Sequence, residues 1–287
     1  MNGEGPVFEI PQPLQYRLAQ SPLVQVLVQV RFPLVAHFQE LTGVADIQDS
    51  LLDLLPYMER QQVQQLAVAL GPAGIDIAPP AEPTVVWRFT ADDQWACMLE
   101  PGSSALMVGG DDYHGIDDFA QRFKRVLEAL HRTRRIRRCD RIGVRYVNVI
   151  EPPGGGRSWV RWFRSEMIGW MGSAIVGNDT QLQMSLTQSQ LAAKPTGPFA
   201  GFPADVQALI RHGVLPLGTE IPFDIGITRQ LDQEAYVLDL DLFIQAPQRF
   251  DLPELMKQFT ALHTQIDAFF RWSLTPEGEK HFGLEEL

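Results

Sequence analysis

The chain has 287 residues, of which 45% are hydrophobic and 21% charged, and its formal net charge is −11. This length and composition are typical of a globular protein with one large domain or two smaller ones. No run of about 18 apolar residues occurs, so we expect no membrane-spanning helix. The N-terminus has neither a basic start nor an apolar core, which argues against a secretory signal and makes a cytoplasmic location the default expectation.

The two cysteines, Cys97 and Cys139, lie far apart, and neither has a CxxC partner. This spacing implies neither a disulfide framework nor a zinc site. We expect two buried thiols, since free cysteine is among the most buried residue types. No metal site and no cofactor are predicted.

The first half of the chain predicts a strand and a helix before a loop. Apolar and polar residues alternate from Val24 to Phe32, the period of a half-buried strand. Apolar residues from Val44 to Leu55 fit a short amphipathic helix. Residues 57–70 fit either a second helix or an extended segment. The glycines and prolines of Gly71 to Pro83 predict a loop.

Three strands and a helix complete this half. The strand-like runs are separated by turn residues and cover Thr84–Thr90, Trp95–Glu100 and Ser104–Gly109. From Ile116 to Leu130 apolar residues recur at helical spacing, with acids in the first turn and arginines at the far end, as the helix dipole favours.

The second half repeats this order. Its opening strand is Arg141 to Ile150, and a tryptophan-rich helix is expected from Ser158 to Met171. Strands are expected at Gln181–Gln188, Glu220–Arg229 and Ala235–Gln245, with an excursion from Leu191 to Gly218 that contains a short helix near Asp205–Arg211. An amphipathic helix follows Asp251 and Pro253 and extends to Phe269.

Each half therefore reads strand, helix, three antiparallel strands, helix, which predicts an α+β fold. We interpret the order as a pseudo-duplication, with one unit at 1–136, including an N-terminal extension, and another at 137–287, in one compact body. The plan is similar to the helix-grip and TATA-box-binding-protein-like architectures. That analogy carries no function.

A family resemblance rests on RIGVRYVNVI at Arg141–Ile150, WRF at Trp87–Phe89, Tyr113, and the helix with Phe119 and Phe123. With these residues the chain resembles a sporadically distributed bacterial protein family of unknown function. The resemblance extends from PLVQVLVQVRFP at Pro22–Pro33 to FFRWSLTPEGEKHFG at Phe269–Gly283. It implies the architecture and no activity or cofactor.

Charged residues on one face of the predicted strands form the candidate ligand site. Arg141 and Arg145 lie on one face of their strand, and aspartates lie on the polar faces of the last two strands. If these faces coincide, the cleft could bind a phosphate-bearing ligand or a divalent cation. The alternative is a solvent face with surface ion pairs. The predicted ligand-binding residues are Arg141, Arg145, Asn148, Asp224, Asp239 and Asp241.

Ten Lys or Arg and two acids lie between Arg122 and Arg145, which makes that segment +8 and the remainder −19. The arginines in the middle of this basic segment could bind a phosphate backbone, or could dock on an acidic surface of this protein or of a partner. The basic patch consists of Arg132, Arg134, Arg135, Arg137 and Arg138.

Tryptophans at 159, 162 and 170 suggest a second surface. Trp159, Trp162 and Trp170 could form a dimer or partner interface, since tryptophan is enriched at interface hot spots, or they could be core residues under the second sheet.

No motif of a familiar catalytic class stands out, so we favour a non-catalytic binding or assembly protein, with a protein partner, a second copy or a small ligand bound between the two units. The first alternative is an enzyme or sensor for a phosphorylated or nucleotide ligand, using Arg145 with Asp239 and Asp241. The second alternative is nucleic-acid binding through the Arg132–Arg138 segment.

Overall fold

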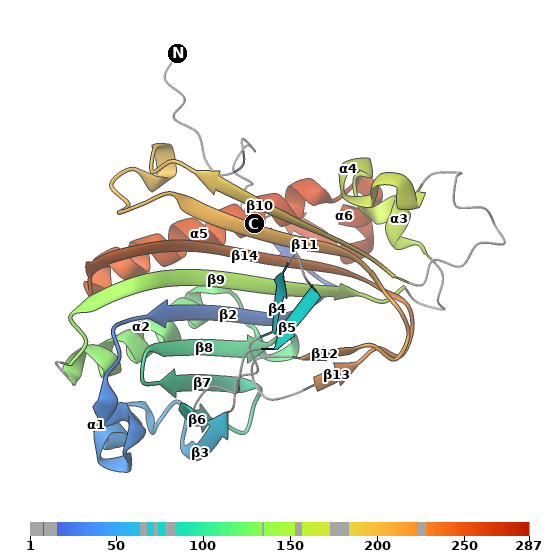
Figure 1. Cartoon of the computed structure of the whole chain (residues 1–287). Coiled ribbons are helices and arrows are strands. Elements are labelled where there is room, and N and C mark those ends of the chain that lie inside the picture. The colour runs from blue at the N-terminus through green and yellow to red at the C-terminus, as the bar shows by residue number, and fades with distance from the viewer. Residues whose placement is uncertain are drawn as a thin grey trace.

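A nine-stranded antiparallel sheet forms the centre of the molecule, in the order β10-β11-β14-β9-β2-β8-β7-β6-β3 (Figure 1). The computed structural model describes residues 8, 16–63, 68–71, 74–77, 84–133, 135–152, 157–172, 184–222 and 228–286. The strands of this sheet are β2 (Leu23–Arg31), β3 (Tyr57–Val63), β6 (Thr84–Thr90), β7 (Trp95–Glu100), β8 (Ser103–Gly109), β9 (Arg138–Ile150), β10 (Ser185–Ala193), β11 (Val206–Leu215) and β14 (Ala235–Arg249).

Three two-stranded sheets pair the remaining strands. They are β1 (Tyr16–Leu18) with β15 (Leu284–Glu286), β4 (Val68–Gly71) with β5 (Gly74–Ile77), and β12 (Glu220–Pro222) with β13 (Thr228–Gln230). The helices are α1 (Leu41–Leu51), α2 (Ile116–Arg132), α3 (Trp159–Trp162), α4 (Ser165–Ile168), α5 (Leu252–Ser273) and α6 (Pro276–Phe282), with 3-10 turns η1 (Ala36–Gln39), η2 (Gly110–Asp112), η3 (Gly169–Gly172) and η4 (Gly197–Phe199).

The α+β class is thereby confirmed, and the sheet continues across the predicted boundary between the two units. Strands β2 and β9 are neighbours at its centre, with Val28 opposite Val144. Each is flanked on its outer side by the last strand that its own half contributes to this sheet, β8 beside β2 and β14 beside β9. The internal duplication itself stays a prediction.

One face of the sheet is covered by α2 and α5, which lie behind it in Figure 1. The alternation read from the sequence places Val26, Val28 and Val30 of β2 on this face, where all three are fully buried. Phe259 of α5 packs against Phe119 and Phe123 of α2, with ring centroids 6.0 and 5.2 Å apart. These aromatic contacts hold the two covering helices together.

The two long helices begin as predicted. Asp117 and Asp118 lie in the first turn of α2, and Arg132 lies in its last. The Asp251 carboxylate accepts from the Glu254 backbone N–H at 3.2 Å and caps α5. Both arrangements satisfy or complement the unpaired amides at a helix start.

Four predictions of local structure are wrong. The loop predicted over Gly71–Pro83 contains strand β5, and the single strand predicted over Glu220–Arg229 contains two strands, β12 and the start of β13, which pair with each other. Where a short helix was expected near Asp205–Arg211, residues 206–211 belong to strand β11, which pairs on both sides, with β10 and with β14. The expected helix over 158–171 is broken into α3, α4 and η3. The break falls where Phe163 forms a β-bridge with Leu274 and the Arg164 N–H donates to the Ser273 carbonyl at 2.8 Å.

Two other predicted segments differ in type or in position from what the sequence left open or predicted. Residues 57–63, for which helix and strand were both open, form β3. The third-last predicted strand lies at Ser185–Ala193 in place of Gln181–Gln188, and its first three predicted residues lie outside the described part.

A cluster of buried and half-buried titratable side chains lies between the sheet and α5. The hydroxyl of Tyr146 hydrogen bonds with Tyr113 Oη and with His263 Nδ1, at 2.9 Å each. Burial lowers the pKa of His263 to about 4. Burial raises the pKa of Asp267 to about 6, against hydrogen bonding from Tyr16 and the charge of Arg271. The two shifts therefore act on stability in opposite directions: as the pH rises, the His263 shift favours the folded state and the Asp267 shift disfavours it.

Asp267→Asn should reveal how Asp267 makes the free energy of unfolding depend on pH. The folded pKa of Asp267 lies above its ordinary value, so its contribution to stability is present at pH 4 and is lost as the pH rises through 6. Relative to wild type, the variant should therefore gain about 2 kcal/mol in unfolding free energy between pH 4 and pH 7. Urea unfolding at the two pH values measures the difference, and an equal difference at both would contradict the raised pKa.

Candidate functional site

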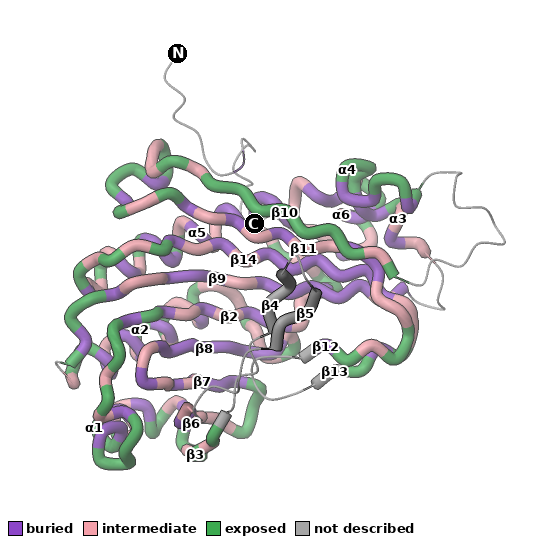
Figure 2. Tube along the Cα trace, in the orientation of Figure 1, coloured by how far each residue is buried: buried purple, intermediate pink, exposed green. Residues whose placement is uncertain are grey.

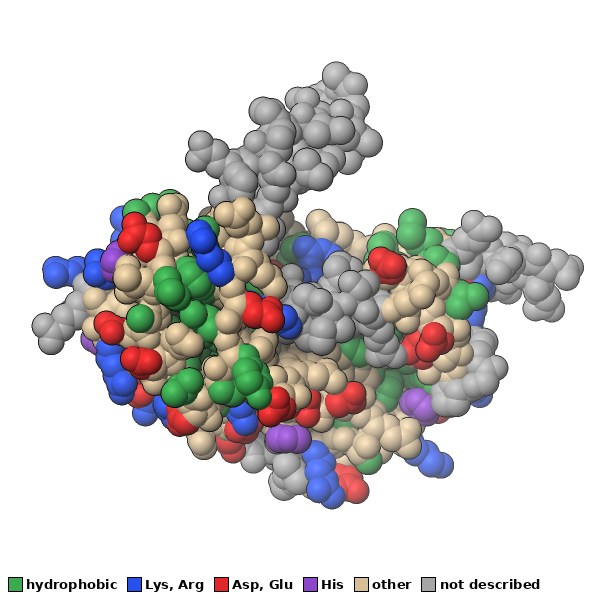
Figure 3. Space-filling view, turned by 90° about the horizontal axis from the view of Figure 1, so that it is seen from below, with side chains coloured by type: hydrophobic (Ala, Val, Ile, Leu, Met, Phe, Trp, Pro, Cys, Tyr) green, Lys and Arg blue, Asp and Glu red, His purple; other side chains and the backbone are tan. Residues whose placement is uncertain are grey.

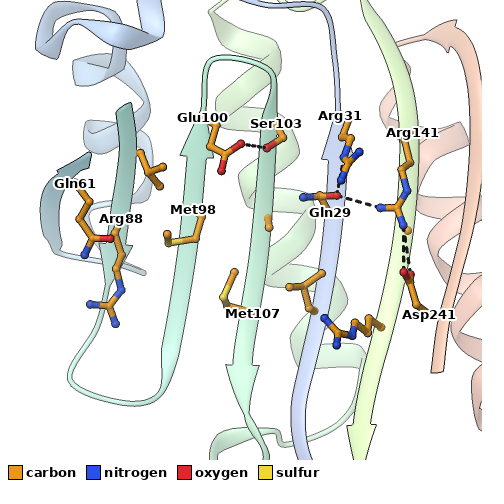
Figure 4. Close-up of a pocket in the computed structure, with 15 residues that line it drawn as sticks. Gln29, Arg31, Gln61, Arg88, Met98, Glu100, Ser103, Met107, Arg141 and Asp241 are labelled. Carbon is orange, nitrogen blue, oxygen red and sulfur yellow. Dashed lines mark hydrogen bonds and ion pairs between the residues drawn. The ribbon is translucent and has the colours of Figure 1, made fainter. Parts of the chain in front are cut away.

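The sheet face opposite the helices carries a pocket of about 520 Å³ (Figure 4). Because side chains alternate along a strand, this open face receives Leu27, Gln29 and Arg31 from β2, and Arg141, Gly143 and Arg145 from β9. Further lining residues come from β3, β6, β7, β8 and β14. The pocket therefore spans strands from both halves of the chain.

Two arginines define one side of the pocket. Arg31 and Arg141 are direct cross-strand partners in the β2–β9 register. The Gln29 Oε1 atom accepts from Arg31 Nε and from Arg141 Nη1, both at 3.0 Å. Arg141 also pairs with Asp241 at 3.3 Å, and its guanidinium lies 4.3 Å from the Phe243 ring centroid. Arg141, Gln29 and Arg31 thus form one connected polar group, visible in Figure 4.

Gly143 makes room for this arrangement. A Cβ atom at Gly143 would lie 2.9 Å from Arg141 Nη1 and 3.0 Å from Phe243 Cβ. The side chain of Arg141 is only 11% exposed. Burial lowers the pKa of Arg141, while Asp241 opposes that shift, and burial raises the pKa of Asp241 against the neighbouring arginines. The ion pair is therefore costly to desolvate and is held in a fixed position.

A second ionic group lies farther along β9 and β14. The Asp239 carboxylate accepts from Arg145 Nε at 2.8 Å and from Arg145 Nη2 at 3.0 Å. Arg211 Nη1 of β11 donates to the same carboxylate at 2.8 Å. One buried acid is thus bound by two half-exposed arginines.

The middle of the pocket is apolar. Leu27, Ala105, Met107 and Met98 line it and are buried or half-buried. Figure 4 shows Met98 and Met107 between the Arg31 side and the Arg88 side. Glu100 accepts a hydrogen bond from the Ser103 hydroxyl at 3.0 Å. Charged groups therefore flank a floor on which an apolar group could rest.

The structure brings together four of the six predicted ligand-binding residues: Arg141, Arg145, Asp239 and Asp241 share the open face. Asn148 does not join them. Its side chain is buried and donates to the Leu238 carbonyl at 3.3 Å, on the face that Tyr146 also occupies. Asp224 lies outside the described residues.

Sequence reasoning missed Arg31 and Gln29. Both belong to the polar positions that alternate with the valines of β2, so the pattern placed them on a polar face. Nothing in the pattern indicated that β2 would lie beside β9 with Arg31 opposite Arg141. The missing information was the strand order.

The predicted basic patch lies at the end of α2 and the start of β9. Arg132, Arg135, Arg137 and Arg138 are exposed, and Arg134 lies outside the described residues. Arg138 pairs with Asp140 at 2.7 Å. Seen from below, acidic and basic side chains are interspersed over the visible face (Figure 3). Nucleic-acid binding through this patch stays a prediction.

The three tryptophans separate into two kinds. Trp159 and Trp162 are buried: Trp159 stacks on Tyr236 with ring centroids 5.3 Å apart, and Trp162 stacks on His281 at 3.6 Å. Trp170 is 59% exposed. The first two therefore form core beneath the second half of the sheet, and only Trp170 lies at a surface.

The described residues contain no cluster of His, Cys, Asp and Glu that could hold a metal ion. No helix in that part of the chain combines the length and apolar composition needed to cross a membrane. Comparison with known proteins gave no matching family model, no matching curated protein and no matching solved structure. The family resemblance of the sequence therefore stays a prediction, and the function rests on the site alone.

Proposed function

We propose that this protein binds a small anionic organic ligand in the open-face pocket, without catalysing its conversion. The observation that carries the proposal is the charge balance beside Gln29. Arg31 and Arg141 approach the same amide oxygen, yet Asp241 pairs with Arg141 alone. Within the described part of the chain, Arg31 pairs with no carboxylate, so one positive charge is left for a ligand.

Guanidinium groups bind carboxylate and phosphate with paired, charge-assisted hydrogen bonds. Arg31 Nε donates its hydrogen bond to Gln29, which orients the guanidinium and leaves its terminal nitrogens available to an anion. Leu27, Met98 and Met107 would then contact the apolar or planar part of the same ligand. Methionine adapts its shape to such groups.

The lining favours binding over chemistry. Asp241 is held in an ion pair and Glu100 accepts from Ser103. Arg145 and Asp239, the residues of the enzyme alternative, bind each other through two hydrogen bonds and are further fixed by Arg211. A carboxylate in such a network is positioned for structure, whereas a general base must reach its substrate.

Calorimetric titration with adenosine 5′-monophosphate tests the proposal, since this probe carries a phosphate and a planar apolar group. Arg31→Gln should weaken binding about tenfold or more, because a hydrogen-bonded charge pair contributes roughly 1.5–3 kcal/mol. Asp241→Asn should strengthen binding, because the ligand no longer competes with this carboxylate for Arg141.

Arg132→Gln is the matched control. It removes the same charge from an exposed position at the end of α2, outside the pocket. Binding of the probe by this variant should equal that of wild type. An equal loss of affinity in Arg31→Gln and Arg132→Gln would show non-specific attraction. If the wild type bound neither this probe nor inorganic pyrophosphate, the anion site would be overturned.

A further inference from the structure

The two edges of the nine-stranded sheet differ in chemistry. The edge strand β3 is seven residues long and carries Glu59 and Arg60. The other edge, β10, has nine residues, SLTQSQLAA, without a charged residue or a proline. Charges, prolines, bulges and short length are the features by which sheet edges avoid pairing with other chains. The β3 edge has such protection, and β10 lacks it.

Strand β10 is also uncovered on its faces. Seven of its nine residues are exposed, whereas the neighbouring strands β11 and β14 are largely buried toward the helices (Figure 2). Leu186 is 56% exposed and Leu191 is 42% exposed. The inner edge of β10 pairs with β11 over its full length. Among the described residues, no strand pairs with its outer edge.

We infer that the outer edge of β10 pairs with the same strand of a second copy of this chain, antiparallel about a two-fold axis at Ser189. This register places Gln188 opposite Gln190 of the second copy, and Leu186 opposite Ala192. On the other face Thr187 meets Leu191. Each contact joins compatible side chains, and cross-strand pairs of this kind stabilise a sheet.

Two copies of this chain can approach at β10 without repulsion between charges on the paired strands. Each molecule has a net charge of −11, so two copies repel over most of their surfaces. Along β10 no charge opposes a charge in the two-fold register, since the strand has none. A symmetric contact needs a self-complementary surface, and an uncharged strand read in both directions provides one.

The contact consists of one pair of antiparallel strands, about 30 Å long at roughly 3.4 Å per residue. An interface of that size lies at the low end of specific interfaces, so we expect dissociation at roughly micromolar concentration. The two-fold axis is perpendicular to the sheet, and therefore both open-face pockets lie on the same side of a continuous sheet.

Sedimentation velocity over roughly a hundred-fold range of concentration tests the inference. Wild type should convert from monomer to dimer. Ser189→Lys places like charges directly opposite each other and should weaken the dimer about tenfold or more, as should Ser189→Glu. An equimolar mixture of the two variants should restore dimers, because lysine then faces glutamate.

Gln62→Lys is the matched control, since Gln62 is an exposed residue of the opposite edge strand β3. It should dimerise as wild type does. A wild type that stays monomeric at every concentration would overturn the inference. So would a Ser189→Lys variant that dimerises normally, or a failure of the mixed variants to associate.

Discussion

Phe259→Ala should lower the free energy of unfolding by about 4 kcal/mol, the largest effect we expect from one substitution. Phe259 is fully buried and its ring contacts Phe119 and Phe123. The substitution opens a cavity between α5 and α2, the two helices that cover the sheet. Helices fixed by packing cannot collapse far into such a cavity, so little of the loss is recovered.

Chemical denaturation measures the effect, with Phe259→Leu as a graded variant that should lose about 1–2 kcal/mol. Thr260→Ala is the control on the exposed side of α5 and should change stability by less than about 0.5 kcal/mol. If Phe259→Ala and Thr260→Ala lost similar amounts, the packing of α5 on α2 would be wrong.

Asp239→Ala should lower the free energy of unfolding by about 3 kcal/mol. Its carboxylate is 8% exposed and accepts hydrogen bonds from Arg145 and Arg211. Removing it takes away the carboxylate that both guanidinium groups share. The loss should be smaller at high salt, because ions screen the repulsion between the two guanidinium groups.

Asp53→Ala provides a matched control. Asp53 pairs with Arg125 at 2.8 Å, the same distance as the Asp239 pairs, but its side chain is 69% exposed. Exposed pairs contribute little, so this variant should show no measurable loss. Equal unfolding midpoints for Asp239→Ala and Asp53→Ala in denaturant would contradict the role of Asp239.

The sequence predicted those elements whose periodicity matches their burial. Strands β2, β6, β7, β8, β9 and β14 and helices α2 and α5 all follow from alternation or helical spacing, because one face of each packs on the same core. Strand β11 was missed since the prolines and glycines around it suggested an excursion. Its structure depends on β14, whose residues lie about thirty positions later in the chain.

The candidate site could be predicted only in part, for a related reason. Alternation on β9 and β14 placed Arg141, Arg145, Asp239 and Asp241 on one face of each strand. Their pairing follows from strand order, which local periodicity does not contain. The role of Arg31 requires the register of β2 against β9, and the role of Gly143 requires the folded position of the Arg141 side chain.

In the proposed anion site, Arg31 and Arg141 together carry one positive charge that no carboxylate of the described residues neutralises. Arginine Nε–H signals in a ¹H–¹⁵N spectrum, assigned from Arg31→Lys and Arg141→Lys, report on it directly during titration with inorganic pyrophosphate. We predict saturable shifts of the Arg31 and Arg141 signals, with the signal of Arg132 unchanged. Shifts of equal size at all three arginines, or no shift at Arg31, would contradict anion binding at this pocket.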